Sequence, residues 1–483
     1  MKKIIVLLFV TIPLSLIAQE KTLTINDFLS IVCRNSDDYK IHEIQIELNR
    51  RQYSSDIHPY NYKLSFSLQS QYNHSINAIT QPDGSIDNHN LSNYSISPTI
   101  NFSIPLYMTG GTISFSSNLN YYKSQTTTNY KSNFSANIYQ FSFSQPIHLH
   151  NSIKWGIKAA KASLWLSNCD IINDYISLKA KACSLYFDLL ESRLVLKRYE
   201  SLLHNLDTLE YVYSNLYSQG KILKVELDEI QINKKEIIDK IEYYNTILTY
   251  NTKTVNNMIG YSLNIDSITL KLPNEVHFID YQLVNMMQKK KQAIYDKFAK
   301  ISLERNVIET KNNKGIQISL GAGLGTNSSA EHFHDLWEKK TPTYNLSISA
   351  RIPISDMKDK NNQYNMAKLR LKQYEISSKS KIKADNSSIE KLVSQFNNSI
   401  VSLKLSNEKE EYLKEEITIK KELLLSKKIL FDDYNRTAQK IIENELNKVS
   451  YARSIYNFLY KIESLTLHDL INDIDYYEEN YIK

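Results

Sequence analysis

Glycine and proline are scarce in this sequence. The 483 residues include 10 glycines and 9 prolines, each about 2% of the chain, against average usages of roughly 7% and 5%. Because both residues interrupt helices and strands, their scarcity predicts long uninterrupted elements. None of the glycines forms a phosphate-cradling loop ahead of a helix, which excludes glycine-dependent nucleoside triphosphatases and dinucleotide enzymes.

Long apolar runs are missing as well. After the first twenty residues no stretch approaches 18 apolar residues, charged residues make up 23% of the chain, and the mean hydropathy is -0.40. These values exclude a polytopic helical membrane protein. Any contact with a membrane must therefore be made by β-strands or by the protein surface.

Cysteine is rare, with Cys33, Cys169 and Cys183 only. Three cysteines are too few for a disulfide-built scaffold of this size. Cys183 belongs to a helically spaced apolar series, so we expect a buried thiol. A Cys169–Cys183 bridge is excluded because fourteen helical residues would separate the two by about 21 Å.

The N-terminus has the layout of a secretory signal peptide. Lys2 and Lys3 precede an apolar run, Ile4–Ile17, and the small residue Ala18 follows. The run is shorter than the ~20 residues that span a membrane, so we expect export and cleavage after Ala18. Removal of residues 1–18 takes away two lysines and leaves 56 basic against 52 acidic residues. This mild, dispersed positive charge predicts no nucleic-acid partner.

Six segments alternate with period two, which is typical of strands with one apolar face. Ser, Thr and Asn occupy most of the intervening positions. The apolar-face residues are Tyr62, Leu64, Phe66 and Leu68; Tyr94, Ile96, Pro98, Ile100, Phe102 and Ile104; Ile113, Phe115, Ser117, Leu119 and Tyr121; Tyr139, Phe141 and Phe143; Ile316, Ile318, Leu320, Ala322 and Leu324; and Tyr344, Leu346, Ile348, Ala350 and Ile352.

The remaining segments indicate very long helices. No glycine or proline lies between Gly156 and Gly220, a stretch that would be about 95 Å long as one helix, and residues 354–483 contain neither residue. A 4,3-spaced series, apolar or aromatic at nine of eleven positions, predicts a coiled-coil seam. Its members are Leu223, Leu227, Ile230, Lys234, Ile237, Ile241, Tyr244, Leu248, Asn251, Val255 and Met258.

The chain carries an internal repeat. The sequence of the strand end at 102–106 is similar to that at 350–354. A turn followed by a helix occurs near Gly220 and again near Tyr434, and aligning these two residues gives an offset of 214. This order predicts a first repeat and a second one, each with a helix, strands and a long helical hairpin. The expected boundaries are a signal peptide, 1–18; a first repeat, 19–260, with strands in 62–146 and a hairpin at 157–259; a linker, 261–280; and a second repeat, 281–483, with strands in 315–354, a hairpin at 357–470 and a short tail.

Strands of this kind in an exported chain favour the wall of an outer-membrane β-barrel over a half-buried soluble sheet. Four or six strands are too few to close a barrel, and open edges are not tolerated in lipid. Several copies must then share one barrel. We expect a mainly α fold with membrane β: long antiparallel coiled-coil hairpins, strands that contribute to a shared barrel, and two internal repeats.

The sequence resembles the TolC-type outer-membrane efflux channel family. The resemblance rests on the opening at 23–29, the strand ends IPLYMTGG and RIPISD, and the turn and helix YSQGKILKVELDEIQ. It implies a homotrimer with one barrel in the outer-membrane lipid and one α-helical periplasmic tunnel. An inner-membrane transporter engages such a tunnel through a periplasmic adaptor protein.

This sequence departs from the family pattern in two places. The family has two strands in each half, whereas 113–123 and 134–146 add a further hairpin here. A barrel shared by three copies then has either twelve strands, with this hairpin in long external loops, or eighteen strands. Tyr434 stands where the family places a glycine in the second tip turn, and a non-glycine residue is disfavoured at positive φ.

The resemblance also implies a gate at the hairpin tips. Gly220 and Tyr434 mark the tip turns, and Glu226 and Arg436 match a carboxylate and an arginine that link neighbouring coils. An arginine fork on a carboxylate forms a strong, breakable link, although both residues also fit ordinary solvated helix charges. Glu443 matches an acidic pore position, whereas Lys440 stands where another acid belongs, which argues against strong cation selectivity.

No catalytic constellation is present. His148 with His150, or His332 with His334, lack the further ligands of a four-ligand metal site, and no cofactor is expected. We therefore expect a passive exit duct for efflux or secretion rather than an enzyme. The alternative is a periplasmic coiled-coil adaptor or spacer without a pore. The sequence identifies neither the transported substrate nor the type of pump.

Overall fold

The computed structural model describes residues 21–80, 82–126, 130–147, 150–262, 268–273, 276–338, 340–426 and 428–476. The expected signal peptide, 1–18, and part of the expected linker, 261–280, lie outside these ranges. The chain forms two compact units. Among the described residues, the first unit comprises 21–45, 171–289 and 385–476, and the second comprises 46–170 and 290–384.

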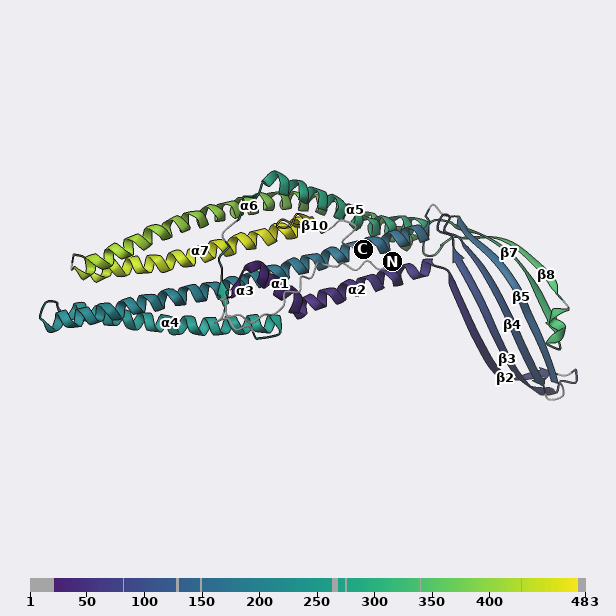
Figure 1. Cartoon of the computed structure of the whole chain (residues 1–483). Coiled ribbons are helices and arrows are strands. Elements are labelled where there is room, and N and C mark those ends of the chain that lie inside the picture. Colours follow the sequence, from purple (N-terminus) through teal and green to yellow (C-terminus); the bar gives the residue numbers. More distant parts are fainter. Residues whose placement is uncertain are drawn as a thin grey trace. The chain divides into compact units, whose positions relative to one another are not determined.

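Long helices and one large sheet make up the described part of the chain (Figure 1). The helices are α1 (Ile25–Asn35), α2 (Asp37–Ile57), α3 (Ser152–Ser218), α4 (Lys224–Ile259), α5 (Tyr281–Lys314), α6 (Met357–Leu425) and α7 (Phe431–Thr466), with 3-10 turns η1 (His58–Tyr60) and η3 (His334–Trp337). The strands are β1 (Lys21–Leu23), β2 (Lys63–Thr80), β3 (Ile86–Pro105), β4 (Thr112–Thr126), β5 (Tyr130–Ile147), β6 (Ile268–Leu270), β7 (Gln317–Ala330), β8 (Thr341–Arg351), β9 (His468–Asp469) and β10 (Ile474–Asp475).

The sheet of the second unit is antiparallel throughout, in the order β2-β3-β4-β5-β7-β8. The six segments with period-two alternation are its six strands. The strands reach 20 residues in β3 and are longer than the apolar alternation suggests. Backbone pairing continues past the apolar stretch into polar residues, for example at the His74↔Ser92 pair, because ladder hydrogen bonds do not require apolar side chains.

Helical segments of the second unit pack through aromatic and polar contacts. Trp165 on α3 stacks on Phe298 of α5, with ring centroids 4.7 Å apart. Asp296 on α5 accepts hydrogen bonds from Tyr374 and Ser378 on α6, at 2.9 and 2.7 Å. These contacts join three helices that are far apart in the sequence.

The first long helix begins earlier than expected. The sequence predicts a hairpin from residue 157, after Gly156, whereas α3 starts at Ser152 and contains this glycine. A Cβ atom at Gly156 would lie 2.0 Å from the hydroxyl oxygen of Tyr60. The glycine therefore permits close approach of Tyr60 to the helix and does not end it.

The first unit contains two helical hairpins, α3/α4 and α6/α7. They share one hydrophobic core, to which α3 contributes Leu206 and Leu209, α4 contributes Ile230 and Ile237, and α7 contributes Tyr434. Among the predicted seam residues, Ile230, Ile237 and Val255 are buried. Polar seam residues find partners on α3: Lys234 pairs with Asp207 and Glu210 at 2.7 and 2.8 Å, and the Asn251 amide donates to Ser192. The heptad interpretation is confirmed.

The described residues that flank the two hairpin turns have matching backbone geometry. Leu223 and Leu430 precede α4 and α7 with φ, ψ of -81°, 153° and -78°, 154°. The N–H of Lys221 donates to Leu216 O, and that of Lys428 donates to Leu423 O. Because α4 begins at Lys224 and α7 at Phe431, the structural offset between the turns is 207 residues.

The predicted offset of 214 is therefore wrong, and so is the placement of Tyr434 in a tip turn. Tyr434 lies in the first turns of α7, and its side chain is buried in the shared core. Gly220 does lie in its turn, with a φ of +68° that favours glycine. The position equivalent to Gly220 is 427, outside the described residues. A shift of seven residues preserves a heptad pattern, so the apolar periodicity did not reveal the error.

The short strands β1 and β6 are anchored on the first unit. Strand β1 pairs in parallel with β6, and the Tyr186 hydroxyl donates to Lys271 O at 2.7 Å and accepts from Lys271 N at 3.1 Å. Cys183 is fully buried, as expected, and Cys33, Cys169 and Cys183 are free thiols.

Candidate functional site

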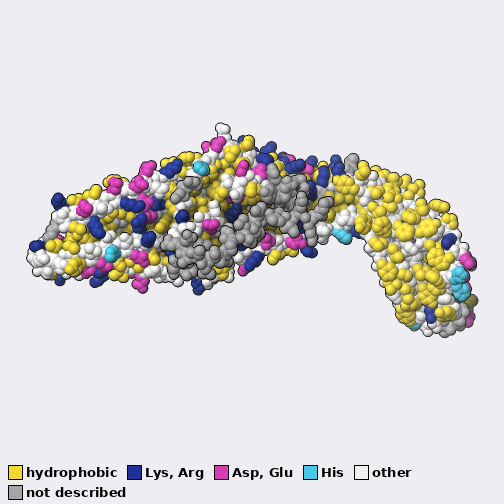
Figure 2. Space-filling model, viewed as in Figure 1, with side chains coloured by type: hydrophobic (Ala, Val, Ile, Leu, Met, Phe, Trp, Pro, Cys, Tyr) yellow, Lys and Arg dark blue, Asp and Glu magenta, His cyan; other side chains and the backbone are white. Residues whose placement is uncertain are grey.

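One face of the six-stranded sheet is apolar and exposed. Side chains alternate between the faces of each strand, and the strand register places the apolar residues of all six strands on the same face. Phe66 is 68% exposed and Leu346 is 82% exposed. Figure 2 shows apolar side chains gathered over these strands. An apolar area of this extent is unusual on a water-facing surface and marks contact with lipid or another protein.

The opposite face is polar and carries hydroxyl and amide side chains. Across its strands, Ser114 and Ser142 lie 2.7 Å apart, and Ser319 and Ser349 lie 2.6 Å apart. The Tyr122 hydroxyl donates to Asn93 Oδ1 at 2.8 Å. One face is thus suited to hydrocarbon and the other to water, which is the pattern of a membrane β-wall.

The sheet is open, with β2 and β8 as its edge strands. Each edge leaves a row of backbone N–H and C=O groups without a ladder partner. Such edges are templates for pairing with another strand, and they are not tolerated in hydrocarbon. Both edges of the sheet are therefore available for pairing with further strands.

None of the helices among the described residues is long and apolar enough to cross a membrane. Likewise, the described residues contain no group of three or more His, Cys, Asp and Glu side chains placed to hold a metal ion. His148 lies outside the described residues. The ring of His150 lies 6.3 Å from that of Trp155.

The structure places the predicted gate residues near the hairpin turns but does not join them. Arg436 is 71% exposed and pairs at 2.7 Å with Asp432 on its own helix. Glu226 lies half-buried in the first turn of α4, and Lys440 and Glu443 are exposed on α7. Within the protomer, therefore, the arginine is engaged by a residue one turn away rather than by Glu226.

A series of other polar contacts joins the two hairpins. Near the turns, the side-chain amide of Asn435 on α7 donates to Asn233 Oδ1 on α4 at 2.8 Å. Further along, Lys421 on α6 donates to Asn205 Oδ1 on α3 at 2.9 Å. The same pair of hairpins is joined again where Arg453 on α7 contacts Glu191 on α3 at 2.6 Å.

The strongest of these contacts is an ionic cluster. Arg198 on α3 pairs with Glu445 on α7 and lies 3.5 Å from Glu410 on α6. Lys448 pairs with both acids, and Lys414 lies 2.6 Å from Glu410. Burial favours the neutral acid, but hydrogen bonds from Lys414 and Lys448 outweigh it and lower the pKa of Glu410 to about 2. Glu410 therefore stays ionised at neutral pH.

Sequence analysis missed these inter-hairpin residues. Asn233, Asn435 and Arg198 occupy helical positions where a polar side chain looks like an ordinary solvated residue. A usable signal for the turn register was present, because Lys-Ile-Leu occurs at 221–223 and again at 428–430. Aligning these triplets gives the correct offset of 207 residues.

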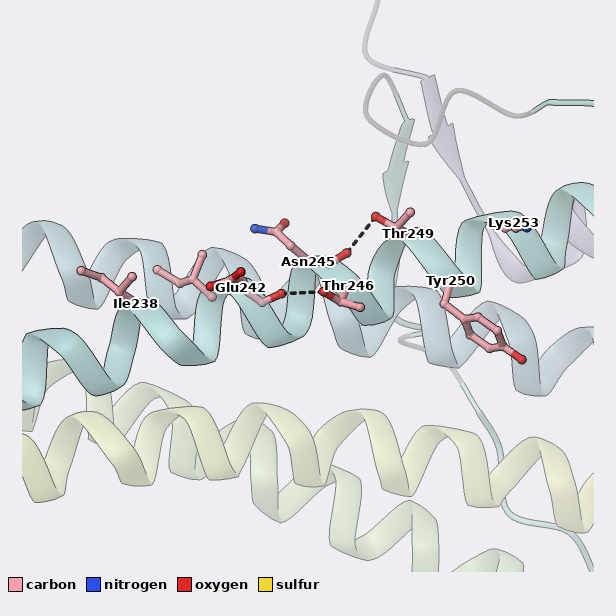
Figure 3. Close-up of a pocket in the computed structure, with 8 residues that line it drawn as sticks. Ile238, Glu242, Asn245, Thr246, Thr249, Tyr250 and Lys253 are labelled. Atoms are coloured by element: carbon pink, nitrogen blue, oxygen red, sulfur yellow. Dashed lines mark hydrogen bonds between the residues drawn. The ribbon is translucent and has the colours of Figure 1, made fainter.

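A groove of about 650 Å³ runs along the exposed side of α4. Figure 3 shows its lining side chains spread along this one helix, with Tyr250 projecting from it. Thr246 and Thr249 turn their hydroxyls back to the carbonyls of Glu242 and Asn245, at 3.0 and 2.9 Å. Their methyl groups and the Ile238 side chain leave a shallow, largely apolar surface of the kind that receives another helix.

Similar folds occur among solved structures of outer-membrane channels. The CmeC outer membrane channel of Campylobacter jejuni is 14% identical, with a TM-score of 0.62 over 92% of this chain and 85% of that chain. The open-state MtrE outer membrane channel of Neisseria gonorrhoeae is 12% identical, with a TM-score of 0.61 over 92% and 89%. The outer membrane protein VceC of Vibrio cholerae is 7% identical, with a TM-score of 0.63 over 92% and 95%.

No protein-family model matches the sequence, and no curated protein sequence matches it. The structural likenesses establish the fold: this chain has the fold of outer-membrane channels. The combination of long helices and a β-sheet that the resemblance to TolC-type channels implies for a single chain is thereby confirmed.

Proposed function

We propose that this protein is a TolC-type outer-membrane channel in which three copies share one β-barrel and one helical tunnel. The observation that carries the proposal is the six-stranded sheet, with one exposed apolar face, one polar face and two open edges. Pairing β8 of one copy with β2 of the next removes every open edge. Three such sheets give an eighteen-stranded barrel, a size that leaves a water-filled channel.

Exposed apolar residues on the long helices support assembly of the tunnel. On α6, Leu405, Tyr412 and Ile419 are exposed and recur every seven residues, the spacing of a coiled-coil contact. On α4, Tyr243 and Tyr250 follow the same spacing and are exposed. In the proposed trimer these stripes and the groove on α4 receive helices of a neighbouring copy.

We further propose that the hairpin turns form the periplasmic end, where an adaptor protein and an inner-membrane transporter engage the tunnel. The contacts between Asn233 and Asn435 and between Asn205 and Lys421 hold the two hairpins of one copy together in the closed state. Glu226 and Arg436 serve as a second latch between neighbouring copies, where an Arg fork and a carboxylate meet. The two helical hairpins are repeats whose turns lie 207 residues apart.

The test is the mass of the detergent-extracted protein from outer-membrane fractions, measured by native mass spectrometry, followed by conductance in planar bilayers. The proposal expects a trimer in that fraction which conducts ions. A soluble monomer or dimer would contradict it and favour a periplasmic coiled-coil spacer, which needs no exposed apolar sheet.

A further inference from the structure

The polar face of the sheet carries no charge over the rows that begin at Ser65, Ser67, Gln69 and Gln71 on β2. These residues and the ones that pair with them across the other strands are Ser, Thr, Asn, Gln, Gly and Tyr only. In the next row, toward the strand ends away from Lys63, Lys131 pairs with Ser124 and adds a positive charge. Many of these side chains bond to one another, as in the Ser97–Asn120 contact at 2.8 Å. A wall of this composition solvates a passing solute without selecting for its charge.

At the strand ends next to the helices, this face carries two positively charged side chains. Lys63 is the first residue of β2 and pairs with Ser103, and Arg351 is the last residue of β8 and pairs with Gln317. Their partners belong to the polar series, so both cations lie on the polar face. Both are exposed, and neither forms an ion pair within the described residues.

Lys63 and Arg351 occupy the two edge strands of the sheet. Strand β2 begins and β8 ends at the same end of the sheet, so joining the edges of adjacent copies brings the two cations to the same seam. Three seams then carry six cations in a ring at the helical mouth of the barrel. Repeated identical charges around an axis are the arrangement by which channels select ions by sign.

We propose that Lys63 and Arg351 form a cationic collar that favours anionic solutes at the helical mouth of the barrel. This inference rests on the proposed trimeric channel and assigns to it a charge preference and the residues responsible. The neutral wall above the collar leaves its field uncancelled. Because the screening length falls from about 30 Å at 0.01 M salt to about 3 Å at 1 M, the preference is strong in dilute salt and lost in concentrated salt.

The experiment measures binding of the trianionic dye pyranine to detergent-purified protein by fluorescence anisotropy, at 10 mM and at 1 M KCl. In the proposed trimer the barrel opens to solvent at the strand ends opposite Lys63 and Arg351, so dye enters there whether or not the gate is closed. The test variant is Lys63→Gln with Arg351→Gln. The matched control is Lys123→Gln, because Lys123 pairs with Tyr94 and lies on the apolar face.

At 10 mM KCl we expect the double variant to bind the dye at least about fivefold more weakly than the wild type, and the control to bind it equally. At 1 M KCl the three proteins should bind it equally weakly. Equal binding by the wild type and the double variant in dilute salt overturns the collar. Native mass spectrometry of the same samples separates the two hypotheses, since a trimer with equal dye binding refutes the collar alone and the absence of a trimer refutes the channel.

Discussion

Asn435 on α7 donates its side-chain amide to Asn233 on α4 at 2.8 Å, which joins the two hairpins of one copy near their turns. Both residues are partly buried, and no charge is involved. A neutral hydrogen bond of this kind contributes about 1 kcal/mol net. It is therefore strong enough to bias a closed state and weak enough to break when a partner protein binds.

Replacing Asn435 with alanine should raise the resting conductance of the trimer in planar bilayers. Loss of about 1 kcal/mol changes the ratio of open to closed states about fivefold for each copy. The matched control is Gln439→Ala, because Gln439 is exposed on the same helix. An Asn435→Ala channel with the conductance of the wild type would exclude this contact from the gate.

The second latch is tested by Glu226→Ala and Arg436→Ala, each alone. Arg436 bonds only to Asp432 within the described part of its own copy, so a conductance increase in the two variants would require a link between copies. We expect both variants to raise resting conductance about equally. Unchanged conductance in both variants would remove Glu226 and Arg436 from the gating mechanism.

The ionic cluster around Arg198 should be important for stability. The Glu445 side chain is only 4% exposed, and its removal leaves Arg198 and Lys448 with Glu410 alone. Breaking a buried pair costs about 3–5 kcal/mol, and the partial exposure of Arg198 reduces this to about 2 kcal/mol or more. We expect Glu445→Ala to lower the thermal unfolding midpoint measured by circular dichroism. Arg51→Ala, which breaks the exposed Arg51–Glu47 pair, is the control and should cost less than about 1 kcal/mol.

Periodicity predicted the elements of this fold because each period has one physical cause. Ile230 and Ile237 repeat every seven residues and are buried against α3, and Leu64 and Phe66 alternate with serines on a two-sided strand. The same periodicity failed at the second turn, because a shift of one heptad leaves the apolar pattern unchanged. Contacts such as Arg198–Glu445, between residues 247 positions apart, depend on how the hairpins dock and leave no local signal.

Stability should also depend on the protonation of Glu463 in α7. Its side chain is fully buried, and burial raises the pKa to about 8 from an ordinary 4.5, although the charge of Lys179 partly opposes the shift. The folded state then binds more protons than the unfolded state between pH 4.5 and 8. The contribution of Glu463 to the free energy of unfolding is therefore greatest below pH 4.5 and declines as the pH rises to about 8.

Glu463→Gln should flatten this dependence, because the amide stays neutral at every pH while its carbonyl can still accept the N–H of Leu470. We expect the unfolding midpoint of the wild type to fall between pH 5 and pH 9 by roughly 5 °C more than that of the variant. Parallel pH profiles for the two proteins would show that Glu463 does not titrate in the folded state.

The orientation of the sheet gives the most direct test of the membrane wall. Leu346 and Asn345 are neighbours on β8 and lie on opposite faces, so one substitution can be placed on either side of the same strand. On a lipid-facing site near the middle of the membrane, arginine costs about 2–4 kcal/mol, whereas a water-filled lumen accepts it. Leu346→Arg should therefore reduce the yield of trimer from outer-membrane fractions, and Asn345→Arg should leave it near that of the wild type. Equal yields, or a larger loss with Asn345→Arg, would mean that the apolar face does not meet lipid, and the sheet would then have to pack against protein.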